Sequence, residues 1–175
     1  GDTKSLTPLD ADLTAAFDAS AAAGGGTDLR KAFTIDETVS ASVKYTGEFL
    51  DDDEESGGLE QNWIELRLGD IILLYAEALN ENSDTPAALV ELNKIRTRAG
   101  LNNSAATTQA AVRQAIQDER RLELAFEGHR WFDLVRTGTV DAEMGQTISS
   151  DYNVFPIPNS EVLASNGVIS QNPGY

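Results

Sequence analysis

Apolar side chains recur at helical spacing in three stretches of the chain, and polar side chains fill the positions between them. The stretches cover residues 67–80, 86–99 and 108–127. Their apolar positions are, in order, Leu68, Ile71, Ile72, Tyr75, Ala78 and Leu79; Leu89, Leu92 and Ile95; and Val112, Ala115, Ile116, Leu122, Ala125 and Phe126. A repeat near 3.6 residues is typical of amphipathic helices that bury one face. The pattern predicts a mainly α-helical protein with irregular loops and little β-structure.

The first two predicted helices form a hairpin. Thr85 is placed to cap the second helix, with Pro86 at its first helical position. Gly100 ends this helix, and Leu101 is placed to fold back on it as in a Schellman-type cap. The short connection makes the two helices antiparallel and gives a tetratricopeptide-type unit. One such unit cannot bury its own faces, so we expect it to pack on other helices.

Residues 1–60 have a weaker pattern and are predicted to be an irregular, acidic part of the same fold. A helix is predicted over residues 9–23, because three glycines follow it and break the helical pattern. Alternation of apolar and polar side chains marks residues 38–46 as a candidate short strand. The acidic stretch 51–58 is predicted to be an exposed loop, since its charges repel one another.

Residues 61–175 are predicted to be the helical region. After the third helix, residues 130–135 continue as another turn or two, and the chain beyond Gly138 is irregular. Residues 153–158 are predicted to be extended, because a residue before proline is pushed away from helical angles. Asn159 is placed to cap a short helix over residues 160–164.

Charge and composition narrow the range of partners. The 175 residues carry a formal net charge of −16, and the sequence contains no cysteine. Such acidity argues against nucleic acid and anionic membrane surfaces, which bind through clustered Lys and Arg. The longest apolar run is far shorter than the roughly 20 residues needed to cross a bilayer. Without cysteine there is no disulfide, thiolate nucleophile or Cys-ligated metal.

The charge is unevenly spread along the chain. Residues 1–60 hold 14 acidic and 4 basic side chains, and residues 141–175 hold 4 acidic and none basic. Residues 61–140 are nearly balanced, with 11 acidic and 9 basic side chains. Balanced charge on helices is typical of ion pairing, whereas the acidic flanks are typical of solvated segments.

Three glutamates of the third helix suggest two opposed interpretations. Glu119, Glu123 and Glu127 follow at four-residue intervals and share one helix face. A pair of carboxylates is the machinery of a glycoside hydrolase. Four arginines lie close by in sequence, at Arg120, Arg121, Arg130 and Arg136.

Neighbouring guanidinium groups lower a carboxylate's pKa, which is the wrong direction for a general acid. We therefore favour a structural ion-pair network that locks the third helix against the hairpin. Its candidate partners are Asp70, Glu77 and Arg96, and Arg120 can reach Glu123 within the helix.

No other residue makes a strong case for chemistry. His129 stands alone and is predicted to be structural or exposed at a helix end. Trp131 and Phe132 are predicted to be core residues rather than a sugar-stacking surface. Tyr45 and Trp63 are weak candidates for ligand binding through their aromatic faces.

The sequence also predicts no catalytic residue, cofactor or metal. Stretch 51–58 imitates the start of a calcium loop, but Ser56 stands where glycine is required and Asn62 where the bidentate glutamate belongs. No glycine-rich phosphate loop or nucleophile elbow is present.

Four segments, in this order, resemble the C-terminal part of SusD/RagB-type proteins. They are Leu66–Glu81 (LRLGDIILLYAEALNE), Leu92–Leu101 (LNKIRTRAGL), Asp118–Leu134 (DERRLELAFEGHRWFDL), and Phe155–Val162 (FPIPNSEV) with the ending Gln171–Tyr175 (QNPGY). The likeness covers residues 60–175 well, and residues 13–30 weakly. One departure is Gly69, where the family usually has alanine. A glycine inside a helix costs about 1 kcal/mol unless a neighbour packs close to it.

The resemblance implies a lipid-anchored protein of the outer-membrane cell surface. Family members bind glycans or other oligomeric nutrients without catalysis and deliver them to a TonB-dependent, SusC-like barrel transporter. Their fold is mainly helical and is built on tetratricopeptide-like hairpins. Whole members are roughly three times longer than this chain, so the resemblance also implies that an N-terminal portion with the lipid anchor is missing here. A tetratricopeptide-like protein-binding scaffold is the alternative function, and a glycoside hydrolase is a third.

Overall fold

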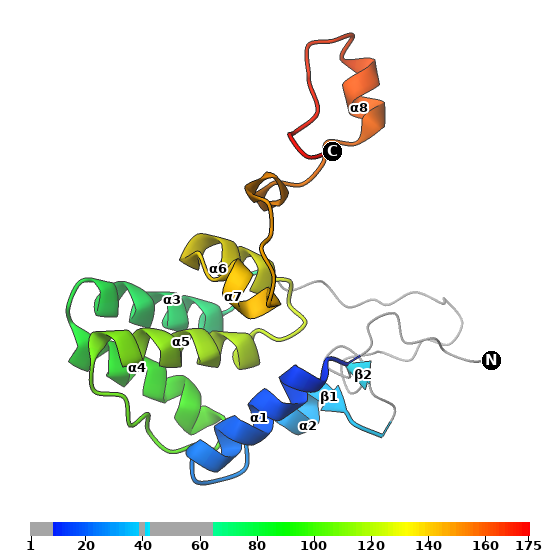
Figure 1. The fold of residues 1–175 in the computed structure, drawn as a ribbon. Coiled ribbons are helices and arrows are strands. Elements are labelled where there is room, and N and C mark those ends of the chain that lie inside the picture. The colour runs from blue at the N-terminus through cyan, green and yellow to red at the C-terminus, as the bar shows by residue number, and fades with distance from the viewer. Residues whose placement is uncertain (1–8, 39–40, 43–64) are drawn as a thin grey trace. The chain divides into compact units, whose positions relative to one another are not determined.

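The computed structural model describes residues 9–38, 41–42 and 65–175. The chain divides into two compact units, Gly1–Gly128 and His129–Tyr175 (Figure 1). The described residues are mainly helical, as the sequence pattern predicts. None of their helices is long and apolar enough to span a membrane.

The first unit is built from helices and one minimal strand pair. Its described elements are α1 (Ala11–Ala23), α2 (Arg30–Thr34), β1 (Ile35–Asp36), β2 (Ala41–Ser42), α3 (Leu68–Glu81), α4 (Thr85–Arg98) and α5 (Gln109–Glu123). β1 and β2 are antiparallel, with Ile35 opposite Ser42. The predicted strand over residues 38–46 falls mostly outside the described residues, and β2 is the described part of it. Its acidic neighbour, stretch 51–58, also lies outside them.

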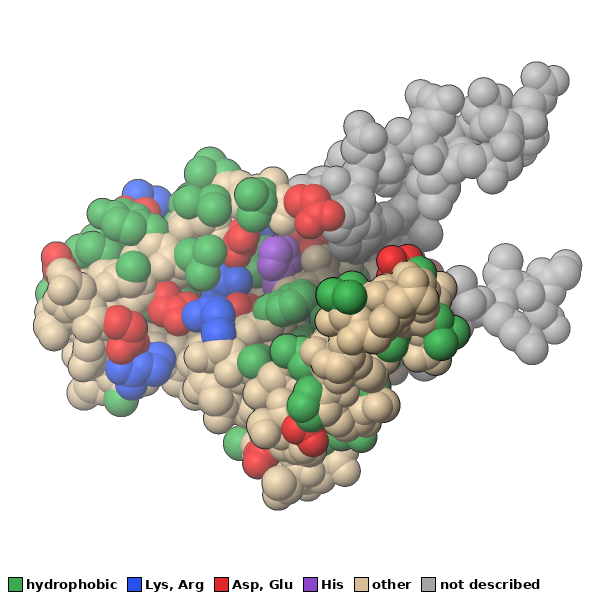
Figure 2. All heavy atoms as spheres, turned by 90° about the horizontal axis from the view of Figure 1, so that it is seen from above, with side chains coloured by type: hydrophobic (Ala, Val, Ile, Leu, Met, Phe, Trp, Pro, Cys, Tyr) green, Lys and Arg blue, Asp and Glu red, His purple; other side chains and the backbone are tan. Residues whose placement is uncertain are grey.

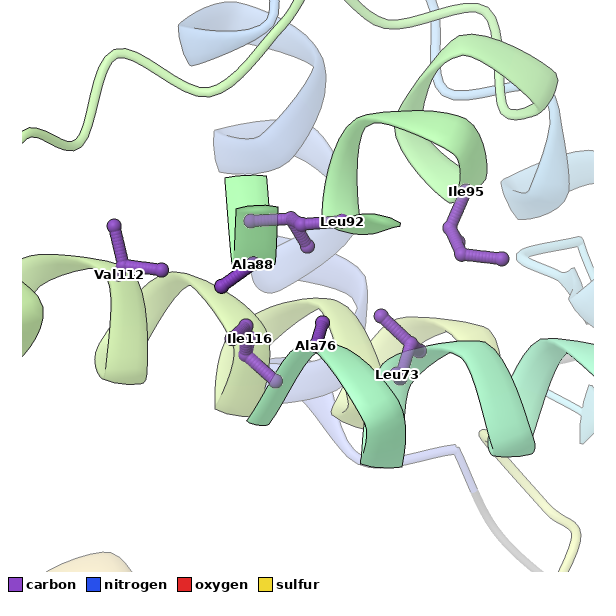
Figure 3. Close-up of a cluster of buried hydrophobic side chains, with 7 residues drawn as sticks. All are labelled: Leu73, Ala76, Ala88, Leu92, Ile95, Val112 and Ile116. Atoms are coloured by element: carbon purple, nitrogen blue, oxygen red, sulfur yellow. The ribbon is translucent and has the colours of Figure 1, made fainter. Parts of the chain in front are cut away.

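Helices α3, α4 and α5 pack around a common apolar cluster (Figure 3). Its buried members are Leu73, Ala76, Ala88, Leu92, Ile95, Val112 and Ile116. Ala76 and Ala88 are both 0% exposed, and side chains of this size let helix backbones approach closely. A second cluster joins α1 and β1 to α5 through Phe17, Ile35 and Leu122. The α3–α4 hairpin therefore packs on a third helix, as predicted.

The face that α3 buries differs in part from the predicted stripe: Ile72 and Leu79 pack against the cluster as predicted, but the rest of the stripe does not. Leu68, Ile71 and Tyr75 are 72%, 48% and 54% exposed, and Leu74 is also exposed. The buried positions are instead Gly69, Asp70, Leu73, Ala76 and Asn80. Apolar side chains surround most of this helix, so its periodicity does not specify which side meets α4 and α5. The unburied side adds to the hydrophobic surface that is visible on the molecule (Figure 2).

Both ends of α4 are capped as predicted, except that the N-cap residue is one position earlier. The N-cap is Asp84 rather than Thr85, because the Asp84 carboxylate accepts from the Ala87 N–H at 3.2 Å. At the other end Gly100 has φ +81°. The Leu101 N–H donates to the Arg96 carbonyl and the Gly100 N–H to the Thr97 carbonyl, which is the Schellman pattern predicted there.

Helix α5 ends at Glu123, four residues before the predicted end. Thr108 caps its start, where its hydroxyl accepts from the Ala111 N–H. A tight turn over residues 124–128 follows, in which Phe126 and Gly128 have φ values of +64° and +81°. The predicted helix over 108–127 was therefore too long. The turn takes Glu127 off the helix face that it would share with Glu119 and Glu123.

The second unit contains short helices joined by turns. They are α6 (Arg130–Thr137), α7 (Val140–Met144), the 3₁₀ helix η1 (Ser150–Asn153) and α8 (Asn159–Ala164). The prediction that the chain is irregular beyond Gly138 missed α7 and η1. Helix α8 is where the sequence places it, but Asn159 is its first residue and makes no side-chain cap. Of the predicted extended stretch, Val154 has extended backbone angles (φ −117°, ψ 150°), whereas Asn153 is the last residue of η1.

Candidate functional site

Charged side chains lie inside the first unit, on the C-terminal half of α5. Glu119, Arg120 and Glu123 are 2%, 4% and 3% exposed, and Glu127 in the following turn is 5% exposed. Charged groups are seldom buried without partners, because removing them from water costs several kcal/mol. The structure supplies those partners from four other segments of the chain.

Glu119 lies between two arginines. Arg96 of α4 places Nη1 3.0 Å from Oε2, and Arg30 of α2 places Nη1 2.7 Å from Oε1. The Oε1 atom is buried and accepts no well-aligned hydrogen bond, so Arg30 acts on it mainly by charge. Burial raises the pKa of Glu119 above its usual value, although both arginines act in the opposite direction.

Glu123 is held by three arginines. Arg67, just before α3, places Nη1 2.5 Å from Oε1, and Arg30 places Nη1 3.2 Å from Oε2. Arg98 at the end of α4 also donates to Oε1. Burial on its own raises the pKa of Glu123. The hydrogen bond and charge of Arg67, with the charge of Arg98, outweigh burial and lower that pKa to about 2.

Three further pairs complete the cluster. Arg67 binds Glu127 with two hydrogen bonds, from Nε to Oε2 at 2.6 Å and from Nη2 to Oε1 at 2.8 Å. Arg30 binds Asp28 in the same bidentate way, at 2.9 and 2.6 Å. Arg120 Nη1 donates to Asp70 Oδ1 at 2.7 Å.

We call this cluster the arginine–carboxylate network. Its members are Asp28, Arg30, Arg67, Asp70, Arg96, Arg98, Glu119, Arg120, Glu123 and Glu127. Acidic and basic members are equal in number, so the network is neutral overall.

The predicted ion-pair network is therefore confirmed, with Asp70 and Arg96 among its members, whereas Glu77 as a partner stays a prediction. Of the arginines that the sequence places near these glutamates, Arg120 belongs to the network, but Arg130 pairs with Glu143 and Arg136 with Asp133. Sequence reasoning missed Arg30, Arg67 and Arg98. The first two lie far from α5 along the chain, and periodicity within a helix contains no information about them. Arg98 is two residues beyond Arg96, and a search for every basic side chain near the end of α4 could have found it.

The carboxylates of the network are poorly suited to act in hydrolysis, because of their protonation state or their burial. A general acid must be protonated near neutral pH and must reach the scissile bond. The lowered pKa of Glu123 fails the first condition, as the sequence predicts. The same prediction was wrong for Glu119, because its burial outweighs the nearby guanidinium groups. Glu119 fails the second condition, since it is 2% exposed.

Gly69 has a packing role beside this network. A methyl group at this position would lie 2.5 Å from Arg67 Nη1 and 2.8 Å from Glu123 Oε1. Both distances are shorter than atoms tolerate, so alanine would require the pair to move. A neighbour therefore does pack close to Gly69, which is the condition under which a glycine inside this helix was expected to carry no penalty.

The other residues that the sequence singled out lie in the second unit or outside the described residues. His129 precedes α6 at the N-cap position and makes no side-chain cap. Phe132 is 59% exposed, so its predicted core position was wrong, whereas Trp131 is half-buried. The Phe132 ring contacts Phe155 edge to face, with centroids 6.3 Å apart. Trp131 and Phe132 are consecutive on α6, so their side chains point to different sides of the helix and one buried face cannot hold both.

The two weak ligand candidates, Tyr45 and Trp63, lie outside the described residues, as does the calcium-like stretch 51–58. Among the described residues, no group of three or more His, Asp or Glu side chains is arranged to hold a metal ion.

The mainly helical fold agrees with the comparisons. The SusD family profile matches residues 25–153, and the chain belongs to this family. It is 32% identical over 132 residues to SusD-like protein P2 of Formosa agariphila, which covers 65% of this chain and 26% of that protein. It is 33% identical to the starch-binding protein SusD of Bacteroides thetaiotaomicron over 62% of this chain and 21% of that protein.

Among solved structures, a SusD homolog from Bacteroides thetaiotaomicron matches with a TM-score of 0.66 at 32% identity. The match covers 83% of this chain and 35% of that one. The chain thus spans about a quarter of the length of the first curated relatives it matches, 26% and 25%.

Proposed function

We propose that this chain is part of a non-catalytic, cell-surface protein that binds glycans and passes them to a SusC-like, TonB-dependent barrel transporter. The observation that carries the proposal is membership of the SusD family together with the 33% identity to a starch-binding member. The outer-membrane location, the lipid anchor and the transporter partner belong to the proposal and rest on the family resemblance.

The described structure supports a binding role over a catalytic one. The carboxylates that could act in glycoside hydrolysis are buried and bound to arginines in the arginine–carboxylate network. A substrate would have to displace several charge-assisted hydrogen bonds to reach them, and each is worth more than an ordinary hydrogen bond. We therefore assign these residues to the scaffold. We leave the ligand contacts to other surfaces, with Tyr45 and Trp63 as candidates.

A glycan panel tests the proposal. The full-length protein that contains this chain is run through native gels with and without starch, a neutral β-glucan and an acidic polysaccharide, while released reducing sugar is measured. We expect one neutral glycan to slow migration without release of reducing sugar. Release that disappears in Glu123→Gln would establish a hydrolase and overturn the proposal. Absence of retardation on every glycan would count against glycan binding.

A protein-binding scaffold is the second candidate. The exposed apolar side of α3, with Leu68, Ile71 and Tyr75, favours it, because contiguous apolar surface often marks a contact with another protein. Selective retention of a barrel partner by full-length protein that retains no glycan would support this alternative. Capture of both a glycan and the barrel would support the first proposal.

A further inference from the structure

Helices α1 and α2 are joined by contacts of their own. Arg30 binds Asp28 with two hydrogen bonds, at 2.9 and 2.6 Å, and Asp28 also accepts from the Ser20 hydroxyl at 3.3 Å. Lys31 on α2 binds Asp18 on α1 at 2.6 Å. These bonds connect the two helices without a residue of α3, α4 or α5. We call α1, α2 and the β1–β2 pair, residues 9–38 and 41–42, the strap.

The strap meets α4 at the turn that ends this helix. The Leu29 N–H donates to the Ala99 carbonyl at 3.0 Å, and the Asn102 N–H donates to the Gly24 carbonyl at 2.9 Å. Both bonds are made by backbone groups outside the hydrogen-bonded ladder of α4. Breaking them therefore removes no hydrogen bond from within that helix.

The apolar contacts divide at the same boundary. The second cluster, in which Phe17 and Ile35 pack with Leu122 of α5, contains the apolar side chains that the strap buries. The first cluster draws all seven of its buried members from α3, α4 and α5. Opening of the strap would expose the second cluster and leave the first one closed.

The charged groups at the boundary have partners on both sides of it. Arg30 of the strap lies 2.7 Å from Glu119 and 3.2 Å from Glu123. Glu119 also pairs with Arg96 of α4, at 3.0 Å. Glu123 also pairs with Arg67, at 2.5 Å. Loss of the sole partner of a buried charge is costly. Here both glutamates would keep an arginine, and Arg30 would leave with the carboxylate that it binds inside the strap.

We propose that the strap opens from α4 and α5 as one unit while these helices stay folded with α3, and that the ion pairs of Arg30 hold it closed. Proteins open in contiguous cooperative units, and the units with few buried apolar contacts open first. Among the described residues, Phe17 and Ile35 are the buried hydrophobic side chains of the strap. A detached helix of 13 residues, the length of α1, is only marginally stable in water, so opening also exposes the amides within it.

Native-state hydrogen exchange of the full-length protein that contains this chain tests the opening. We expect the Phe17 and Leu29 amides to share one protection factor, at least about a hundredfold lower than that of the Leu92 and Ile116 amides. Equal protection of all four amides would show that the strap opens only in complete unfolding. Different protection of Phe17 and Leu29 would show that they open separately. Either result would overturn the proposal.

A substitution in the first cluster tests whether this cluster survives the opening. Ile116→Val weakens contacts that the closed and open forms share, so it destabilises both forms equally. We expect it to lower the protection of the Leu92 amide by about two- to tenfold and to leave the Leu29 amide unchanged. An equal fall at Leu29 would contradict the proposal, because the strap would then open together with the first cluster.

Arg30→Gln should act differently, because it weakens the closed form alone. It leaves the buried Asp28 carboxylate without its guanidinium until the strap opens and water reaches it. We expect the protection of the Leu29 and Leu92 amides to fall by the same factor, at least about tenfold. A fall at Leu92 alone, or at neither amide, would show that Arg30 does not hold the strap closed and would overturn the proposal.

Gly26→Ala provides the same test without a change of charge. A methyl group at this position would lie 3.0 Å from the Gly100 carbonyl oxygen, where the strap meets the end of α4. We expect an equal fall at the Leu29 and Leu92 amides, and this variant decides the matter if Arg30→Gln fails to fold. Arg113→Gln is the matched control, because its ion pair is about two-fifths exposed, and it should change either amide by less than about threefold.

Discussion

The helical region of the first unit and the second unit are each stabilised internally by a different kind of contact. In the first, α3, α4 and α5 share a cluster in which six of seven side chains are fully inaccessible to water, and the charged groups next to it are paired. In the second, Leu134 and Val140 are the buried hydrophobic side chains among the residues described. Large apolar side chains such as Phe155, Leu163 and Val168 remain 66%, 77% and 88% exposed there.

Polar side chains make several of the hydrogen bonds that hold the second unit in its fold. Gln171 binds the backbone of Ile157 twice, accepting from its N–H and donating to its carbonyl, both at 2.8 Å. Asn172 donates to the Phe155 carbonyl at 2.7 Å, and the Tyr175 hydroxyl donates to the Val154 carbonyl at 3.2 Å. These bonds fasten the last residues of the chain to the extended stretch before α8.

The difference shows how the two regions should respond to change. Apolar burial and buried charge pairs concentrate stability in a few side chains, whose loss leaves a cavity or an unpaired charge. Exposed hydrogen bonds compete with water, and each contributes only about 0.5–1.5 kcal/mol. Substitutions should therefore cost most in the first unit and least in the second, and four measurements test this order.

The largest loss is expected from the buried charges. Arg120→Ala removes the carboxylate-bound guanidinium beside buried Asp70, and Glu123→Ala removes one carboxylate partner from each of three arginines, so each substitution upsets the balance of charge in the network. We expect each to lower the free energy of unfolding by about 3–5 kcal/mol, measured by urea denaturation. Arg113→Ala is the control, because its pair with Glu81 is about two-fifths exposed and should cost less than about 1 kcal/mol. Unchanged midpoints in both buried variants would mean that these charges are solvated.

The apolar core should respond almost as strongly. Leu92→Ala removes a fully buried side chain from the centre of the first cluster, and we expect a loss of about 2–5 kcal/mol. Val90→Ala on the same helix, where the side chain is 59% exposed, should change the free energy of unfolding by less than about 0.5 kcal/mol. Equal effects of the two substitutions would show that the buried and exposed faces of α4 do not differ in their contribution to stability.

Acid should weaken the first unit through Glu123. The pKa of Glu123 is about 2 in the folded protein and near 4.5 when the chain is unfolded, so its contribution is complete above pH 4.5 and is lost as the pH falls towards 2. The loss amounts to roughly 3 kcal/mol. Glu119 acts with the opposite sign, because its raised pKa makes protonation favour the folded state as the pH falls.

The measurement compares thermal midpoints at several values between pH 7 and pH 3. Glu123→Gln should start from a lower midpoint and lose less between those limits than the unchanged protein. Asp118→Asn, at an exposed position, serves as the control and should keep the original pH dependence. An equally steep loss in Glu123→Gln would place the acid sensitivity elsewhere.

The smallest effect is expected in the second unit. Gln171→Ala removes two hydrogen bonds to Ile157, and we expect a local loss of about 1–2 kcal/mol, seen as faster hydrogen exchange at the Ile157 amide. Gln146→Ala, at an exposed position, should leave that amide unchanged. A global loss as large as that of Leu92→Ala would show that the tail has a much greater structural role than its exposure suggests.

The sequence predicted the elements better than their contacts. The hairpin and the Schellman cap at Gly100 were predictable, because spacing, proline and glycine act within a few residues. The early end of α5 was not, since Leu124 and Ala125 have good helix propensity and the turn places Glu127 against Arg67. The buried side of α3 was predicted only in part, because Leu68 and Leu73 are alike in hydrophobicity and only the neighbouring helices distinguish them.

The arginine–carboxylate network was predictable only in part, because some of its members lie close together in sequence and others do not. Four-residue spacing identified the shared face of Glu119 and Glu123, and the expected packing of this helix on the hairpin suggested Asp70 and Arg96 as partners. Arg30 and Arg67 could not be inferred, because they reach the network from segments that no local pattern links to α5. The family followed from the order of four sequence segments and was confirmed by the match over residues 25–153.

By itself, the sequence determined that this chain is acidic, mainly helical and a member of the SusD family, because periodicity, caps and residue order are local properties. The tertiary structure alone decided which side of α3 is buried, where the balanced charges of residues 61–140 meet, and why residue 69 is glycine. Each of these depends on the distance between groups that are remote along the chain. Close approach of Arg67 to Glu123 requires the missing side chain at Gly69, and burial of the Glu123 carboxylate requires the arginines that pair with it.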